Sequence, residues 1–263
     1  MDLDDAYDNV GYIPDAAAYE PRWRDAAEAF RQRMSLADRA RLGLMYGHGT
    51  RQAMDLFLPD QQPVGLTVFV HGGYWRRFDR SLFSHFATGF LAHGQAVMLP
   101  SYDLVPRVRI CDIARQVAQA ITVAAHEVAG PVRLVGHSAG GHLVARMLAP
   151  GMLEDDVHRR IAQAMPISPV SDLRPLLETR MNADFRLDAD EAEAESPVFQ
   201  PKPDMPVTVW VGADEKPVFL DQARWLAEAW NCGHVVQPKR HHFDVIDDLL
   251  DPQSEMVRTL MRD

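Results

Sequence analysis

Short, almost uninterrupted apolar runs recur along most of the chain. They cover residues 66–70, 96–99, 132–135, 164–167, 207–211 and 234–236. Runs of this length without a polar face are typical of strands covered on both sides, as in a parallel sheet. Helix-length stretches such as 107–128 and 217–230 lie between most of them. This alternation predicts an α/β fold, with a mostly parallel, doubly wound sheet and helices on both of its faces.

The N-terminal part follows a different pattern. Residues 1–40 have helical character, and Ser35 with Asp38 three positions later resembles the start of a helix. Residues 42–46 and 52–58 flank the sequence Gly47-His48-Gly49, which indicates an antiparallel hairpin. We therefore expect an N-terminal helical segment followed by an antiparallel hairpin.

Residues 172–205 interrupt the alternation of strands and helices. This stretch is acidic, contains several prolines, and has helical pieces but no convincing strand. It is too short and too polar to hold a core of its own, so we expect a single domain over 1–263 with this stretch as an excursion above the sheet. The pattern fits a cap or lid over a site and a merely solvated acidic helix equally well.

Charge and cysteine content exclude several classes of protein. The chain has 27 Lys and Arg against 37 Asp and Glu, a net charge of −10, which opposes binding to nucleic acid or anionic membranes. Its two cysteines, Cys111 and Cys232, are far apart, which favours reduced thiols over a disulfide framework or a structural zinc site. The acidic N-terminus lacks a signal-peptide pattern, so we expect a soluble, cytoplasmic protein.

The strongest chemical motif is the sequence Gly136-His137-Ser138-Ala139-Gly140, which follows one apolar run and precedes a helix-forming stretch. A strand that turns directly into a helix strains the backbone of the serine, exposes its hydroxyl, and leaves room only for glycine at the flanks. The alternative is a glycine-rich phosphate loop, but no Lys-Ser/Thr pair follows and no GxGxxG pattern is present. The motif therefore predicts a nucleophilic serine, with the Ala139 N–H beside it at a helix N-terminus.

A nucleophilic serine needs a base and an acid, which in this chain order follow it as acid and then histidine. The run 207–211 leads into Asp214 and Glu215, and the run 234–236 is followed by His241 and His242. Histidine suits the role because its ordinary pKa lies near 6.5. The residues leave open which acid and which histidine are used.

Backbone donors for an oxyanion are expected where the run 66–70 meets His71-Gly72-Gly73-Tyr74-Trp75. Adjacent glycines let bare N–H groups approach a small anion, so Gly72 and Gly73 join Ala139 as the predicted oxyanion hole. A simple tight turn is the alternative. Chemistry of this kind needs no cofactor, and no metal site is expected, because His137 and His142 do not share a helical face.

These motifs resemble those of the kynurenine formamidases (arylformamidases), which are α/β-hydrolases near the hormone-sensitive-lipase-like esterases. The similar segments are His71–Trp75, Ser101–Pro106, Gly136–Gly140, Ser168–Leu173 and His242–Ile246. The resemblance implies an α/β-hydrolase fold and favours His242 over His241 as the base. It favours Glu215 slightly over Asp214 as the acid, because the spacing of Pro217, Phe219 and Gln222 then matches the family pattern.

The resemblance also implies an activity, that of a serine hydrolase which cleaves a small acyl group through an acyl-enzyme. The expected substrate is N-formylkynurenine or a similar formamide. The alternatives are a short-acyl carboxylesterase or thioesterase and a non-catalytic ligand-binding protein on the same fold. Substrate contacts are expected from His71, Tyr74, Trp75, Arg76 and His137. Partners other than a small-molecule substrate are not expected, and a homodimer is compatible with the sequence but unsupported by it.

The two arginines that follow Trp75 depart from the family pattern, which has uncharged polar residues there. Arg76 and Arg77 would lie beside the oxyanion loop. Two cations in that place could attract a substrate that carries a carboxylate. Solvated surface arginines are the alternative, and the sequence does not decide between the two.

Overall fold

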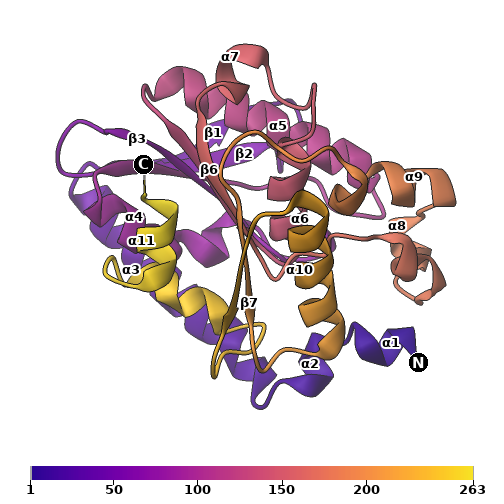
Figure 1. The fold of residues 1–263 in the computed structure, drawn as a ribbon. Coiled ribbons are helices and arrows are strands. Elements are labelled where there is room, and N and C mark those ends of the chain that lie inside the picture. Colours follow the sequence, from indigo (N-terminus) through magenta and orange to yellow (C-terminus); the bar gives the residue numbers. More distant parts are fainter. Residues whose placement is uncertain (1, 263) are drawn as a thin grey trace.

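A central sheet organises residues 2–262, the part of the chain that this computed structural model describes. Its eight strands follow the order β1-β2-β4-β3-β5-β6-β7-β8 (Figure 1). The strands are β1 (Ala40–Met45), β2 (Ala53–Phe57), β3 (Gly65–Val70), β4 (Gln95–Pro100), β5 (Val132–His137), β6 (Ile161–Ile167), β7 (Thr208–Gly212) and β8 (Gly233–Gln237). Each apolar run of the sequence coincides with one of them.

The strand directions agree with the predicted fold class. β1 and β2 form the expected antiparallel hairpin, and β2 also pairs antiparallel with β4. The strands from β4 through β8 run parallel to their neighbours. The prediction of a mostly parallel sheet with an N-terminal antiparallel hairpin is therefore confirmed.

Helices cover both faces of this sheet (Figure 1). One layer contains α5 (Ile110–Glu127), α6 (Ala139–Met147) and α10 (Pro217–Trp230), and the other contains α3 (Tyr19–Leu36), α4 (Thr88–Ala92) and α11 (Glu255–Leu260). Successive strand side chains point to opposite faces, so Val68 packs in the first layer and Phe69 in the second. Both faces of the central strands are therefore buried, which explains why their sequences are apolar without alternation.

The N-terminal segment is helical, as expected, but its boundaries differ from the prediction. It contains α1 (Leu3–Ala6), α2 (Asn9–Tyr12), a 3₁₀ turn at Ala16–Ala18, and α3. Ser35 does not begin a helix, because it lies in the last turn of α3. The chain leaves that helix through Asp38, whose φ of 55° lies in the left-handed region, and then enters β1. The helix start predicted from Ser35 is therefore wrong.

The acidic excursion contains short helices, as predicted, and within the described residues it adds no strand to the sheet. Its helical pieces are the 3₁₀ turn Arg174–Glu178, α8 (Asn182–Phe185), α9 (Ala189–Ala194) and the 3₁₀ turn Pro197–Phe199. It is more than a solvated helix, because Glu195 is buried in an ion pair with Arg146 at 3.0 Å and Phe185 packs in the main core.

The longest helices of the described chain are amphipathic rather than apolar throughout. None of the helices within residues 2–262 is long and apolar enough to cross a membrane. In α5, buried positions such as Ile113 and Val117 alternate with exposed polar ones, as expected for a helix that covers a sheet.

Candidate active site

Ser138 occupies a sharp turn between β5 and α6. Its φ of 58° and ψ of −119° place a non-glycine residue in a strained conformation. The neighbouring glycines are required by the crowding. A Cβ on Gly136 would lie 2.3 Å from the Gly140 carbonyl oxygen, and one on Gly140 would lie 2.0 Å from the Val70 carbonyl oxygen. The turn has the strand–turn–helix geometry that the motif predicts.

His242 and Glu215 form a buried pair at the ends of neighbouring strands. Glu215 follows β7 and His242 follows β8. Glu215 Oε2 lies 2.6 Å from His242 Nδ1, and each residue is only 3% exposed. The second carboxylate oxygen, Oε1, accepts hydrogen bonds from the Gly212 N–H at 2.8 Å and from the Ser168 hydroxyl. The carboxylate is thus held by fixed donors on one oxygen and faces the imidazole with the other.

The structure separates the candidates that the sequence left open. Asp214 is exposed, and its backbone N–H donates to the Arg240 carbonyl. His241 does not contact Glu215, because its Nε2 lies 3.0 Å from the Tyr19 hydroxyl. Glu215 and His242 are therefore the acid and histidine that the fold brings together.

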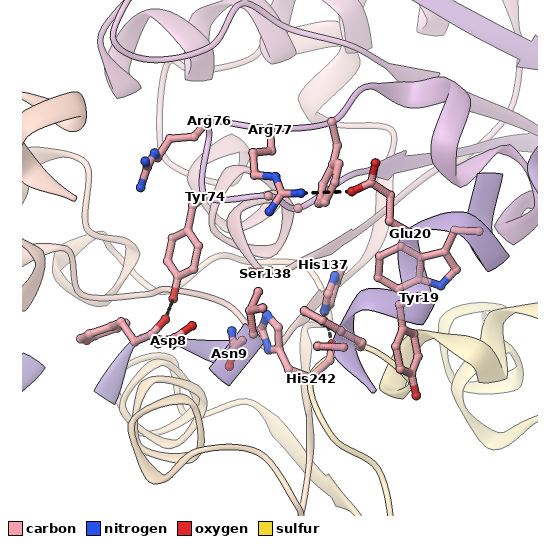
Figure 2. Close-up of a pocket in the computed structure, with 18 of the residues that line it drawn as sticks. Asp8, Asn9, Tyr19, Glu20, Tyr74, Arg76, Arg77, His137, Ser138 and His242 are labelled. Atoms are coloured by element: carbon pink, nitrogen blue, oxygen red, sulfur yellow. Dashed lines mark hydrogen bonds and ion pairs between the residues drawn. The ribbon is translucent and has the colours of Figure 1, made fainter. Parts of the chain in front are cut away.

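Ser138 and His242 open onto a pocket of about 650 Å³ (Figure 2). One wall comes from the loop after β3, and the opposite wall comes from the N-terminal segment. The N-terminal lining residues are Asp4, Tyr7, Asp8, Asn9, Val10, Ala16, Ala17, Tyr19, Glu20 and Trp23. From the acidic excursion only Met181 reaches this pocket. The N-terminal wall was not predicted from the sequence, which left open whether residues 172–205 form a cap over the site or a solvated helix.

The N-terminal wall is fixed to the body of the fold through Tyr7. The Tyr74 hydroxyl donates to the Tyr7 carbonyl at 2.7 Å, and Gln222 Nε2 donates to the Tyr7 hydroxyl at 2.8 Å. Burial raises the pKa of Tyr7 to about 12, so its hydroxyl stays protonated. The Asp4 carboxylate adds a hydrogen bond from the Arg180 N–H at 2.7 Å.

The glycine loop passes directly beside Ser138. A Cβ on Gly72 would lie 3.0 Å from Ser138 Cβ, and Gly73 has a φ of 108°, where a side chain would also meet the Arg77 carbonyl at 2.7 Å. Within residues 2–262, the N–H groups of Gly72, Gly73 and Ala139 donate to no protein acceptor. Unused backbone donors beside a nucleophile are what an oxyanion requires.

Two of the expected substrate contacts lie below the loop rather than in the pocket. His71 is stacked between Phe83 and Tyr102, with ring centroids 5.6 Å and 4.5 Å away, and burial lowers its pKa to about 4. Trp75 is fully buried, with its ring 5.0 Å from that of His142. Neither lines the pocket, so they support the glycine loop from beneath. The rings of His71 and Trp75 pack in the core instead. The expectation that they line the pocket was therefore wrong.

Three other expected contacts, Tyr74, Arg76 and His137, do line the pocket. His137 also holds the loop after β8 in place, because its Nε2 lies 2.7 Å from the His242 carbonyl oxygen. Burial, followed by the neighbouring His242, lowers the pKa of His137 well below its ordinary value, so it remains neutral. Arg76 is paired with Asp184 at 2.8 Å, and Arg77, the second arginine of the loop, is paired with Glu20 at 3.0 Å.

A group of potential metal ligands lies elsewhere on the surface. His126, Glu154 and Asp156 place their ligand atoms within 4.8 Å of one another, and all three side chains are exposed. None of them lines the pocket. This group therefore contributes nothing to the chemistry of Ser138.

Comparisons with known proteins agree with this geometry. Residues 67–241 match a family model described as the alpha/beta hydrolase fold. The kynurenine formamidase of Salmo salar is 27% identical over 239 residues, which cover 84% of this chain and 81% of that protein. The kynurenine formamidase of Drosophila melanogaster is 28% identical over 241 residues, which cover 82% and 79%.

Solved structures show the same fold. A crystal structure from Silicibacter sp. TM1040, described as a "putative thioesterase", is 57% identical, covers 100% of both chains and has a TM-score of 0.97. Esterase B from Lactobacillus rhamnosis is 17% identical over 92% of this chain and 95% of its own, with a TM-score of 0.68. The resemblance to kynurenine formamidases that the motifs indicated is confirmed, and the chain belongs to the α/β-hydrolase family.

Proposed function

We propose that this chain is a serine hydrolase in which Ser138 is the nucleophile, His242 the base and Glu215 the acid. The observation that carries the proposal is the 2.6 Å contact between Glu215 and His242, in a pocket that also contains the strained Ser138. A buried carboxylate fixes the tautomer of a histidine and stabilises its protonated form, which makes the other ring nitrogen an effective base. No cofactor is required.

The mechanism transfers an acyl group in two steps. His242 Nε2 removes the proton of the Ser138 hydroxyl as Ser138 Oγ attacks the substrate carbonyl. The N–H groups of Gly72, Gly73 and Ala139 bind the negative oxygen that forms, and each such donor is worth roughly 3–4 kcal/mol of barrier in a comparable enzyme. Protonated His242 then releases the leaving group, and water cleaves the acyl-enzyme through the same base.

The proposed substrate is an arylformamide such as N-formylkynurenine. Two features support it: relatives over most of the chain are kynurenine formamidases, and the pocket has an aromatic lining. That lining is formed by Tyr7, Tyr19, Trp23, Tyr74, Phe78, Phe83 and Phe243. Aromatic side chains can stack on an arylamine leaving group.

A short-acyl thioesterase or carboxylesterase is the second candidate. It is favoured by the description of the 57% identical Silicibacter structure as a "putative thioesterase". The same three groups would perform that reaction, because the leaving group alone differs. A non-catalytic binding protein would need no paired acid and histidine next to a strained serine.

The experiment that tests these readings compares three substrates. Purified protein is assayed for release of kynurenine from N-formylkynurenine, of p-nitrophenol from p-nitrophenyl acetate, and of free thiol from a short acyl-CoA. Fast ester or thioester cleavage without detectable kynurenine would eliminate the formamidase. A fluorophosphonate probe should add its mass to Ser138, and Ser138→Ala should abolish both labelling and turnover. A wild-type protein that is neither labelled nor active would support the binding-protein alternative.

A further inference from the structure

The side chain of Asn9 is buried in the pocket without a hydrogen-bond partner. Asn9 begins α2 on the N-terminal wall and is 4% exposed. Its Oδ1 is buried and accepts no hydrogen bond, and within residues 2–262 its Nδ2 donates none. Leaving a buried polar group unsatisfied is unfavourable, so nearly all such groups in folded proteins have a partner. A partner supplied by a ligand would explain this one.

The backbone around Asn9 is fixed, so its side chain is presented to the pocket in a defined place. The Asp8 carboxylate accepts from the Gly11 N–H at 3.1 Å, and the Asn9 carbonyl accepts from the Ile13 N–H at 3.1 Å. On the other side, the Tyr7 carbonyl is held by Tyr74. These bonds order the short helix and leave the Asn9 carboxamide unused.

Asn9 lines the same pocket as the proposed catalytic groups. Figure 2 shows its side chain among the lining residues, together with Ser138 and His242. The acidic neighbours on this wall already have partners: Asp4 is paired with Arg180, Glu20 is paired with Arg77, and the Asp8 carboxylate accepts from the Gly11 N–H. The Asn9 carboxamide is therefore a neutral group, available for hydrogen bonding, in the pocket that contains Ser138.

We propose that the Asn9 carboxamide hydrogen-bonds the polar leaving group of an arylformamide substrate. This inference rests on the proposed function. A carboxamide offers one acceptor and one donor group. An arylamine with a carbonyl substituent, as in N-formylkynurenine, offers the complementary N–H and C=O. A site with a buried polar group discriminates against substrates that leave that group unpaired, so Asn9 acts as a specificity-determining residue.

The test replaces Asn9 by the similarly sized but apolar leucine. Asn9→Leu is compared with wild type on N-formylkynurenine and on phenyl acetate, whose leaving group lacks the carbonyl substituent. We expect KM for N-formylkynurenine to rise about tenfold, with a much smaller change for phenyl acetate. Asn9→Ala should show the same discrimination without added bulk, which keeps the test valid if the leucine variant does not fold.

Tyr12→Phe provides the matched control. Tyr12 belongs to the same short helix, does not line the pocket, and its hydroxyl has no hydrogen bond within the described residues. This variant should behave as wild type on both substrates. The labelling rate of Ser138 by a fluorophosphonate is measured in each protein to show that the nucleophile is intact.

The outcomes separate this inference from the proposed function. Equal losses on both substrates, or no loss on either, in folded Asn9 variants would overturn the role of Asn9 alone. Cleavage of phenyl acetate without cleavage of N-formylkynurenine by wild type would overturn the arylformamide and the inference together, while the serine mechanism would stand. Absence of labelling and of all turnover in wild type would overturn the proposed function itself.

Discussion

The Ser168 hydroxyl donates a hydrogen bond to Glu215 Oε1, the carboxylate oxygen that does not face His242. Ser168 is completely buried at the end of β6, one strand away from β7. With the Gly212 N–H it gives this oxygen two donors and sets the direction of the whole carboxylate. In the proposed mechanism, Ser168 is therefore a positioning residue that acts on His242 through Glu215.

Replacing Ser168 by alanine should slow the reaction. A hydrogen bond to a charged group is worth about 1.5–3 kcal/mol, so we expect kcat to fall by about tenfold or more. The KM should change much less than kcat, because Ser168 does not line the pocket. A lower melting temperature with an unchanged kcat would indicate a purely structural role.

The neighbouring acids Asp214 and Glu215 form a matched pair for mutation. Glu215→Gln keeps the size but removes the charge next to His242, and we expect kcat to fall roughly a thousandfold or more. Asp214→Asn removes an exposed carboxylate and should change kcat by less than about twofold. The kcat of each variant is measured by steady-state kinetics on the best substrate and compared with that of wild type. Similar losses in the two variants would contradict the choice of Glu215.

Tyr7→Phe should loosen the N-terminal wall of the pocket. The change removes the hydrogen bond from Gln222 Nε2, which keeps its second bond to the Asp172 carbonyl. A loss of about 1 kcal/mol should increase opening of the segment roughly fivefold. Limited digestion with chymotrypsin, which can cut at the exposed Tyr12, measures this opening. Unchanged digestion would show that Tyr7 does not hold the wall.

His142 should make the stability of the protein depend on pH. Burial lowers its pKa from 6.5 to about 3, so the unfolded chain takes up a proton at a higher pH than the native chain does. The contribution of buried, neutral His142 to the free energy of unfolding is therefore complete above pH 6.5. It is lost progressively as the pH falls toward 3. This group alone contributes a slope of about 1.4 kcal/mol per pH unit.

The variant His142→Gln tests this slope. Glutamine does not titrate, and its amide can still donate to the Glu195 carbonyl that His142 Nε2 contacts at 2.8 Å. Urea unfolding is measured at several pH values between 4.5 and 6, and the free energy of unfolding is plotted against pH. The slope of this plot should be lower for the variant than for wild type by about the same 1.4 kcal/mol per pH unit. The comparison of slopes holds even if the variant is less stable at every pH. Equal slopes of unfolding free energy against pH in the variant and in wild type would refute the prediction.

The strands and the serine turn could be predicted because residues adjacent in the sequence specify them. The run before Gly136 is apolar at every position except Arg133, since both faces of β5 are covered, and the turn needs glycines within two residues of Ser138. Local sterics and burial decide these features. The residues that specify each of these features therefore lie within about ten consecutive positions of the sequence.

The choice between adjacent side chains could not be read in the same way. Asp214 and Glu215 both follow β7, and which of them points inward depends on the direction of the turn after Gly212. His71 and Trp75 have the composition of a binding loop, yet the turn at Gly73 directs them into the core. Their positions depend on the packing of neighbouring elements, which a single sequence does not contain.

The N-terminal wall escaped prediction for a related reason. The helical character of residues 1–40 was recognisable, but not where these helices would dock. Tyr7 meets Gln222 across 215 positions of sequence, and no local pattern encodes such a contact. The role of Asn9 could not be predicted from the sequence either, because only the folded structure shows that its buried carboxamide lacks a hydrogen-bond partner.

Tyr19 and His241 lie 222 positions apart in the sequence and are joined by a hydrogen bond. The segments around both residues must therefore be folded before the pocket is complete. During translation, His137 emerges from the ribosome 105 residues before His242. A nascent chain that stops before residue 242 therefore carries Ser138 without His242. The pocket can be complete only after β8 and the loop that follows it have been synthesised.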